Sequence, residues 1–305
     1  RALEMMRAAL LLASSTVALS LPAASLSAPV VVLGPGSLDM RLLTAKLAAR
    51  SGRPTTLFAA SGAAQEIWLE QMYGVEDPSM PLESSPDPLR PKMASSPDER
   101  EEALRTAEAL ALIADGVIMP EAALNSVLEA APQLKRVVHL SKMGVTRATA
   151  GPLGLGSEGV KQLESEERLR EACESADIGL SIVRVGTLKG GGPGRVENVI
   201  DVGLARPYYD NVMDIETLRV TQAYDKVTLG AKCVAGDPIE PVNTIQRALR
   251  KGSFEPHDDE TSRVVACGAV VAALAHDAPL EFSVSAAAAD AAPTCGQWEA
   301  ILNGL

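Results

Sequence analysis

The residues that could do chemistry begin with a glycine-rich turn, Gly34-Pro35-Gly36-Ser37-Leu38, which directly follows the apolar run 30–33. An apolar pattern of helical period starts at once after the turn. This order is typical of a nucleotide-binding βαβ unit, because backbone N–H groups and a helix N-terminus can face a phosphate there. The sequence therefore predicts a dinucleotide site with all five residues of the turn as contacts.

The third glycine of the dinucleotide fingerprint is missing. The spacing Gly-x-Gly-x-x-Gly places it at Asp39, and the wider spacing Gly-x-x-Gly-x-x-Gly places it at Met40. Either side chain would hinder the close packing of helix on strand that this glycine permits. A strand-to-helix turn that binds nothing is therefore the alternative for this motif taken alone.

The end of the second predicted strand, 55–59, would select the cofactor. An acid at this place holds the ribose 2′-hydroxyl of NAD, and an arginine suits the 2′-phosphate of NADP. The residues here are Ala60 and Ser61, which are both neutral. We expect them to line the cofactor site, and the cofactor stays open between NADP and NAD.

The elements that must position these residues alternate between apolar strands and amphipathic helices. This alternation predicts an α/β fold, a Rossmann-like doubly wound parallel sheet with a small C-terminal substrate-side region. In the first helix, Lys46 and Arg50 are one turn apart and are expected to face solvent. The predicted strands are 30–33, 55–59, 109–114, 136–141, 179–188 and 280–284, and the predicted helices are 38–51, 63–73, 97–107, 120–131, 157–175, 262–276 and 297–302.

The charge and aromatic content of the chain limit the classes of partner that we expect it to bind. The chain has 28 Lys and Arg against 39 Asp and Glu, which gives a net charge of −11, and only 3% of its residues are aromatic. A polyanion would be repelled and bases would find few stacking surfaces, so no nucleic-acid partner is expected. The cysteines form no Cys-x-x-Cys pair, which argues against a zinc site and a disulfide framework and favours reduced, mostly core residues; they are Cys173, Cys233, Cys267 and Cys295.

Some segments do not follow the repeating pattern. Residues 1–28 have a basic start, an apolar centre and small residues before Pro29, which predicts a removable signal or transit segment and no stable membrane span after processing. A plastid location is expected, with secretion as the alternative. Residues 74–97 are rich in proline and predict an exposed loop. The domain would then be 29–305, with 196–254 as its substrate-side segment.

The run 137–145, Val-Val-His-Leu-Ser-Lys-Met-Gly-Val, resembles a strand and loop of the atypical short-chain dehydrogenase/reductase family, in its NmrA-like, NAD(P)-binding branch. Glu166-x-x-Leu169-Arg170 and the run 179–188 resemble a helix of that branch and its strand ending in Arg-Pro-Gly. Ser262-Arg263-Val264-Val265-Ala266 resembles its late helix start. The resemblance covers about residues 30 to 273. It implies an NAD(P)-binding protein, and an oxidoreductase acting on a small carbonyl or quinone-like compound.

The catalytic pair of the family carries over only in part. Related reductases use a tyrosine as proton donor and a lysine four residues later that holds the ribose. Here Lys161 follows Ser157 at that spacing, and a serine hydroxyl is a much weaker acid than a phenol. The resemblance assigns Ser141 the orientation of a carbonyl, Lys161 a ribose contact and Val185 a cofactor contact. The alternatives are a turn-closing hydroxyl for Ser141 and a solvated helix residue for Lys161.

Other polar residues fit structural roles. His139 alternates within an apolar strand and is expected to be a core histidine rather than a general base. In the helix 157–175, the four-residue spacings Glu164/Arg168 and Glu166/Arg170 predict a solvated, ion-paired face.

The rival functional class is a catalytically silent dinucleotide sensor or assembly factor with a protein partner. The serine in place of the tyrosine and the missing third glycine motivate it. A fold that retains no ligand is the third interpretation.

Overall fold

A computed structural model describes residues 28–59, 62–73, 90–149, 157–191, 203–240 and 256–305. Apart from its last position, the predicted leader 1–28 lies outside these residues, and so do Ala60 and Ser61. Within the described ranges, every helix is too short or too polar to cross a bilayer.

The apolar runs of the sequence form the strands of one eight-stranded sheet. Its strands are β1 (Val30–Leu33), β2 (Thr55–Phe58), β3 (Lys92–Ala94), β4 (Ala109–Ile113), β5 (Arg136–Lys142), β6 (Gly179–Val185), β8 (Gly230–Ala235) and β10 (Glu281–Ala287). Their spatial order is β3-β2-β1-β4-β5-β6-β10-β8. All neighbouring pairs are parallel except β8 with β10, which is antiparallel. The predicted Rossmann-like α/β fold is therefore confirmed.

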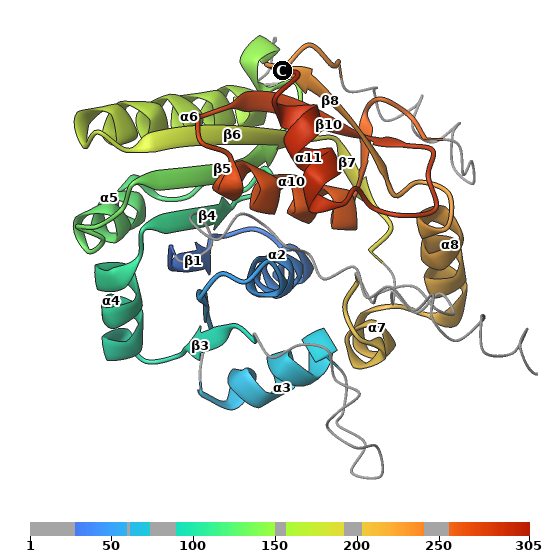
Figure 1. The fold of residues 1–305 in the computed structure, drawn as a ribbon, viewed down its shortest axis with the longest axis horizontal. Coiled ribbons are helices and arrows are strands. Elements are labelled where there is room, and N and C mark those ends of the chain that lie inside the picture. The colour runs from blue at the N-terminus through green and yellow to red at the C-terminus, as the bar shows by residue number, and fades with distance from the viewer. Residues whose placement is uncertain (1–27, 60–61, 74–89, 150–156, 192–202, 241–255) are drawn as a thin grey trace, which may run out of the picture.

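Helices cover both faces of this sheet (Figure 1). The helices are α2 (Leu38–Arg50), α3 (Gly62–Tyr73), α4 (Pro97–Thr106), α5 (Glu121–Glu129), α6 (Ser157–Ser175), α7 (Arg206–Val212), α8 (Ile215–Asp225), α10 (Arg263–Ala275) and α11 (Cys295–Leu302). A short 3₁₀ turn, η2 (Val145–Arg147), follows β5, and a small parallel pair joins β7 (Thr187–Lys189) to β9 (Glu260–Ser262). In Figure 1, α4 and α5 lie on one side of the strands and α2 and α10 on the other.

Alternate residues of each central strand enter different cores, as the two-residue period of a strand requires. In β1, Val30 and Val32 pack in the core under α2 and α10. Val31 and Leu33 pack in the opposite core, which Leu104 of α4 and Leu169 of α6 complete. Burial on both faces explains why the parallel strands read as continuous apolar runs.

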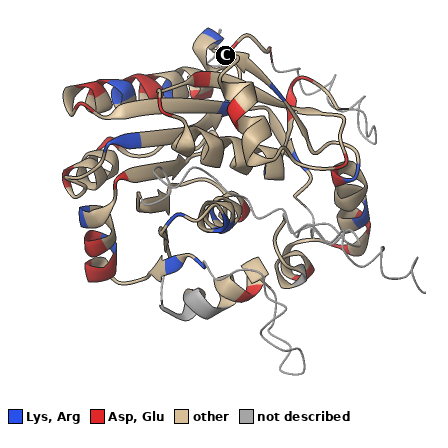
Figure 2. Ribbon diagram, in the orientation of Figure 1, with Lys and Arg blue, Asp and Glu red and all other residues tan. Residues whose placement is uncertain are grey.

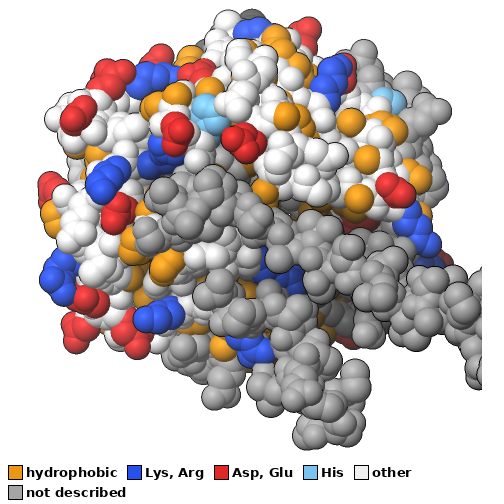
Figure 3. Space-filling model, in the orientation of Figure 1, with side chains coloured by type: hydrophobic (Ala, Val, Ile, Leu, Met, Phe, Trp, Pro, Cys, Tyr) orange, Lys and Arg blue, Asp and Glu red, His pale blue; other side chains and the backbone are white. Residues whose placement is uncertain are grey.

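The charged residues stay mainly on the outer helices. Figure 2 shows acidic and basic residues along α4 and α6. On the face drawn in Figure 3, basic side chains lie among acidic ones, and those of the described residues form no broad basic surface.

The predicted loop 74–97 is wrong over part of its length. Residues 74–89 lie outside the described residues, but Lys92–Ala94 form β3, which pairs in parallel with β2. Three residues between Pro91 and Ser95 suffice for an edge strand because Met93 and Ala94 are buried. Proline density pointed to a loop, and it concealed this short strand.

The predicted substrate-side segment 196–254 contributes to the main sheet. Its described part forms α7, α8 and β8, and β8 is the edge strand beside β10. The edge of β8 away from β10 ends the sheet. The predicted strand 179–188 is also two strands, because the chain leaves the sheet at Gly186 and β7 pairs with β9 instead.

Lys46 contradicts the prediction that it faces solvent. Its side chain is fully buried, and Nζ donates hydrogen bonds to the carbonyls of Met72 at 2.8 Å and Gly203 at 2.6 Å. The amide of Ala205 donates to the carbonyl of Gln71 at 2.8 Å beside it. These bonds join α2, the end of α3 and the start of the substrate-side segment.

Candidate functional site

The candidate site lies between β1 and β4, at the switch point of the sheet, where the order of the strands reverses. From β1 the chain proceeds to β2 and β3 on one side, and then returns to β4, β5 and β6 on the other. In doubly wound sheets, ligands bind outside the carboxyl ends of the strands at such a point. The predicted glycine turn connects β1 to α2 here.

Both glycines of the turn lie against the end of β4. A Cβ atom on Gly34 would lie 2.1 Å from the carbonyl oxygen of Ile113, and one on Gly36 would lie 2.7 Å from it. Gly34 also has a φ of +137°, a conformation that side chains disfavour. The two glycines thus allow the turn to pass close to β4.

The backbone N–H groups of the turn differ in whether they are hydrogen-bonded within the protein. The Gly36 N–H donates to the Ile113 carbonyl at 2.9 Å, so it is already committed within the protein. Ser37 is the N-cap residue of α2 and makes no side-chain capping hydrogen bond. The first-turn N–H groups of a helix have no intrahelical partner. The start of α2 is therefore the part of the turn that suits an anion such as a pyrophosphate.

Met40 and Asp39, the two residues in place of the third glycine, make different contacts. Met40 is fully buried in the core, where the Sγ of Cys267 in α10 lies 3.5 Å from its carbonyl oxygen. Its thioether is therefore used in packing α2 on α10 and not in filling the turn. Asp39 forms an ion pair with Arg263, with Nε 2.8 Å from the carboxylate. Close helix packing is achieved here without the glycine.

Charge at the start of α2 is mixed. Asp115, the second residue after β4, has a φ of +48°, and its carboxyl accepts a hydrogen bond from the hydroxyl of Ser37. Burial, and then the charge of Asp39, raises the pKa of Asp115 to about 6, while Arg263 and Lys142 act in the opposite direction. A pyrophosphate would meet the helix N-terminus and Arg263, but also two carboxyl groups. The backbone fits the group, and the acids weaken its binding near neutral pH.

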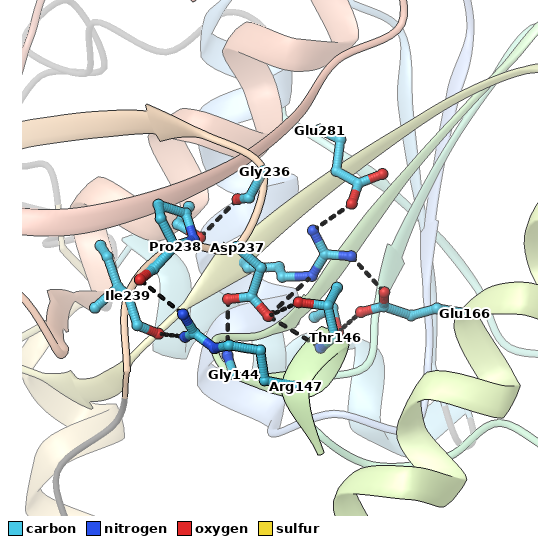
Figure 4. Close-up of polar contacts among 12 residues, drawn as sticks. Gly144, Thr146, Arg147, Glu166, Gly236, Asp237, Pro238, Ile239 and Glu281 are labelled. Carbon is cyan, nitrogen blue, oxygen red and sulfur yellow. Dashed lines mark hydrogen bonds and ion pairs between the residues drawn. The ribbon is translucent and has the colours of Figure 1, made fainter. Parts of the chain in front are cut away.

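Ser141 is brought to a buried ionic cluster and not to the turn. Its hydroxyl donates to Glu166 of α6, whose other carboxylate oxygen accepts from Arg184 at 2.5 Å. Arg184 also donates to Glu281 at 2.7 Å, and its Nε lies 4.0 Å from Asp237 (Figure 4). Burial opposes the charge of Arg184, but Glu166 and Glu281 outweigh burial and raise the pKa of the guanidinium.

Asp237 ties this cluster to the loop after β5. Its carboxylate accepts from the Gly144 amide at 2.8 Å, and from the amide and hydroxyl of Thr146 at 3.1 Å and 2.9 Å (Figure 4). Arg147 donates in turn to the carbonyls of Pro238 and Ile239. The loop that would face a substrate is thus clamped by the segment that follows β8.

The expectation that His139 is a core histidine is confirmed. The side chain is buried, and Nδ1 has no hydrogen-bond partner in the described part of the chain. Burial, and then the charge of Arg184, lowers the pKa of His139 to about 4. A neutral imidazole is therefore expected at pH 7. It borders a cavity of about 10 Å³, which has room for one water molecule; the cavity is lined by Ala114, Gly116, Val117, Ile118, His139, Ser141, Gln162 and Ser165.

The remaining predicted contacts are dispersed. Pro35 and Ser37 are exposed in the turn, and Leu38 is half-buried at the start of α2. Lys161 lies on the exposed side of α6, and Ser157 is the first residue of that helix. Val185 is buried, and its carbonyl accepts from the Met143 amide at 2.9 Å.

Sequence reasoning missed Glu166, Arg184, Asp115 and Arg263. It placed Glu166 on a solvated face paired with Arg170, which is wrong, because Glu166 is buried against Arg184 and Arg170 pairs with Glu281 at 2.9 Å. The signal available was an arginine inside the apolar run of β6. A strand buried on both faces can hold such a cation only with a carboxylate partner.

No model of a known protein family matches the chain, and no curated protein matches it. Solved structures do. A Bacillus halodurans protein that carries the provisional name NAD-dependent epimerase/dehydratase is 12% identical, with a TM-score of 0.52, and the match covers 91% of this chain and 100% of that one.

Two further structures are yeast methylglyoxal/isovaleraldehyde reductase Gre2 complexed with NADPH and ChuY, an anaerobillin reductase from Escherichia coli O157:H7. The first is 11% identical with a TM-score of 0.46, and the match covers 84% of this chain and 75% of that one. The second is 12% identical with a TM-score of 0.45, with 84% and 96% covered. At 12% identity the comparison with the Bacillus protein shows a shared fold and no more.

Proposed function

We propose that the chain binds a nicotinamide dinucleotide, NADP or NAD, at the turn between β1 and α2, as a protein of the NmrA-like branch of the atypical short-chain dehydrogenase/reductases. The observation that carries the proposal is the position of Gly34 and Gly36 against Ile113 at the switch point of the sheet. The uncapped start of α2 beside it supplies donors for the pyrophosphate.

Equilibrium titration with NADPH and NADH tests this function. We expect saturable binding of at least one of them below about millimolar concentration, the range in which many enzymes bind their substrates. Gly296→Ala, in the exposed first turn of α11, is the matched control that keeps binding. If neither dinucleotide binds at millimolar concentration, the proposal is wrong.

The reaction we propose is the reduction of a small carbonyl or quinone-like compound. The dinucleotide would supply the hydride and a water molecule the proton, Lys161 would contact the ribose, and Ser141 would orient the carbonyl. A hydroxyl that donates to Glu166 is not free to donate to a substrate at the same time. Reduction therefore requires the Ser141 hydroxyl to exchange this partner.

The same hydrogen bond favours a second function, that of a catalytically silent dinucleotide sensor or assembly factor. Ser157 stands in place of the proton-donating tyrosine, and Ser141 is already satisfied within the protein. A turnover screen separates the two functions. Cofactor-dependent reduction that Lys161→Ala lowers supports the reductase, and dinucleotide binding without turnover of any carbonyl or quinone supports the sensor.

A further inference from the structure

One arginine lies across the ends of two strands beside the proposed dinucleotide site. Arg100, in the first turns of α4, donates from Nη2 to the carbonyl of Ala59 at 2.5 Å and to that of Ser95 at 3.4 Å. Ala59 directly follows β2 and Ser95 directly follows β3. The guanidinium carbon also lies 5.8 Å from the centre of the Phe58 ring. The two hydrogen bonds and the Phe58 ring thus hold the Arg100 side chain at the carboxyl end of β2.

The residues at the carboxyl end of β2 bear on the choice between NADP and NAD. In doubly wound folds the ribose 2′ position lies at the end of the second strand, where an acid favours a hydroxyl and an arginine accommodates a phosphate. Phe58 ends β2 in this chain and Ala59 follows it, and neither carries a charge. The nearby cation is Arg100 of α4, 41 residues after Ala59 in the sequence.

The Arg100 guanidinium keeps donor capacity after its two carbonyl bonds. Both bonds come from Nη2, so Nη1 makes no hydrogen bond within the described part of the chain; Nε has no partner there either, but it is buried and out of a ligand's reach. A guanidinium has five N–H donors in a planar fork that matches phosphate oxygens, and hydrogen bonds of this charged kind are strong. Arg100 can therefore hold a phosphate while it stays bonded to Ala59 and Ser95.

Of the two carboxylates next to Arg100 in the sequence, Glu99 and Glu101, the first is already hydrogen-bonded within the protein. Glu99 accepts hydrogen bonds from the amides of Ser95 and Ser96, at 2.7 Å and 2.9 Å, in the capping box of α4. These bonds, the one to Ser96 first, lower the pKa of Glu99 to about 2. Glu99 therefore stays charged and capped, and it opposes a phosphate less than an acid at the end of β2 would.

We propose that Arg100 binds the ribose 2′-phosphate and makes this site selective for NADP(H) over NAD(H), an inference that rests on the dinucleotide-binding function proposed above. The net charge of −11 disfavours every anion in general. A preference for the more highly charged dinucleotide therefore requires a local cation, and Arg100 supplies it.

The test compares pairs of ligands that differ only in this phosphate. We expect the full chain to bind NADPH at least about tenfold more tightly than NADH, and 2′,5′-ADP to compete better than 5′-AMP, since a charge-assisted hydrogen bond contributes that much. Arg100→Ala should lower NADPH affinity by about tenfold or more and leave NADH affinity within about twofold. Arg100→Lys should fall between them, because lysine keeps the charge but loses the fork.

Arg105→Ala is the matched control, since Arg105 is an exposed arginine of the same helix that pairs with Glu102. It should change neither affinity. Equal wild-type affinity for NADPH and NADH overturns the inference and leaves the proposed function intact. Selectivity that survives Arg100→Ala, or an equal loss of both dinucleotides in that variant, also overturns it. Failure of wild-type protein to bind either dinucleotide removes the proposed function and this inference together.

Discussion

The hydroxyl of Ser141 donates a hydrogen bond to the carboxylate of Glu166, across the gap between β5 and α6. The same carboxylate accepts from Arg184 of β6, and all three side chains are buried. The end of β5 is thus held by a buried ion pair. Ser141, which the sequence predicts to be catalytic, is thus part of the hydrogen-bonded structure that joins β5 to α6.

The Glu166–Arg184 pair should be a large determinant of stability. Glu166→Leu leaves the fully buried Arg184 without its closest partner, and removing one member of a buried pair costs about 3 to 5 kcal/mol. Urea unfolding measures this loss. Glu167→Leu, its exposed neighbour in α6, should change the free energy of unfolding by less than about 0.5 kcal/mol.

The double variant Glu166→Leu/Arg184→Met completes the experiment. It replaces both charges by apolar side chains and should recover much of the loss, because buried pairs are often replaceable in this way. A double variant as unstable as the single one would show that the charges themselves are required.

The pH dependence of stability should report Asp115. Burial, with the charge of Asp39, raises the pKa of Asp115 to about 6 from 3.8. Between these values the folded protein binds more protons than the unfolded chain, so this group makes stability fall as pH rises from about 4 to about 6. Asp115→Asn should remove that fall and stabilise the protein at pH 7 by on the order of 2 kcal/mol.

Asparagine suits this test because it tolerates the positive φ of the position. Urea unfolding at several pH values from about 4 to about 7 gives the measurement. Asp177→Asn is the control, since Asp177 is exposed and has a φ of +56°. The assignment to Asp115 is refuted if the wild type and Asp115→Asn lose stability equally over this range.

The glycine turn should tolerate no side chain. In Gly34→Ala the new Cβ would lie 2.1 Å from the Ile113 carbonyl oxygen at a φ of +137°, so turn and strand must separate. We expect destabilisation of about 2 to 4 kcal/mol and loss of dinucleotide binding. Thermal unfolding and the NADPH titration check both effects.

Gly296→Ala is the matched comparison for Gly34→Ala. Nothing lies within 4 Å of its new Cβ, and alanine favours a helix by up to about 1 kcal/mol over glycine. It should be neutral or stabilising. An equal effect of the two substitutions would contradict the packing of the turn on β4.

Lys46→Met should unfold more readily than wild type. Methionine has similar bulk but cannot donate to the carbonyls of Met72 and Gly203, and an unsatisfied buried group costs about 1 to 3 kcal/mol. Chemical denaturation measures the loss. Lys135→Met, whose side chain is 74% exposed beside Glu108, should cost less than about 1 kcal/mol. Faster amide exchange near Ala205 in Lys46→Met would locate the effect in this joint.

Much of the fold could be predicted because burial on both faces leaves a direct trace in sequence. Apolar runs such as 109–113 become central parallel strands, and Ser96 with Glu99 forms the capping box that starts α4. Short or marginal elements leave a weaker trace. Lys92–Ala94 has too few residues for a visible period, and β8 mixes buried with exposed positions, so each was recognised only by its pairing in the sheet.

The sequence by itself determined the chain order of the central strands β1, β2, β4, β5, β6 and β10, the glycine turn after β1 and the neutral end of β2. Periodicity tells which apolar residues share a face, but it does not tell which distant charge meets a polar residue. Only the tertiary structure brought Arg184 to Glu166, Arg263 to Asp39 and Arg100 to Ala59, because each pair joins different elements whose contact depends on how they pack. A buried charge is stable only with such a partner, so the folded arrangement decides where each of these polar side chains can lie.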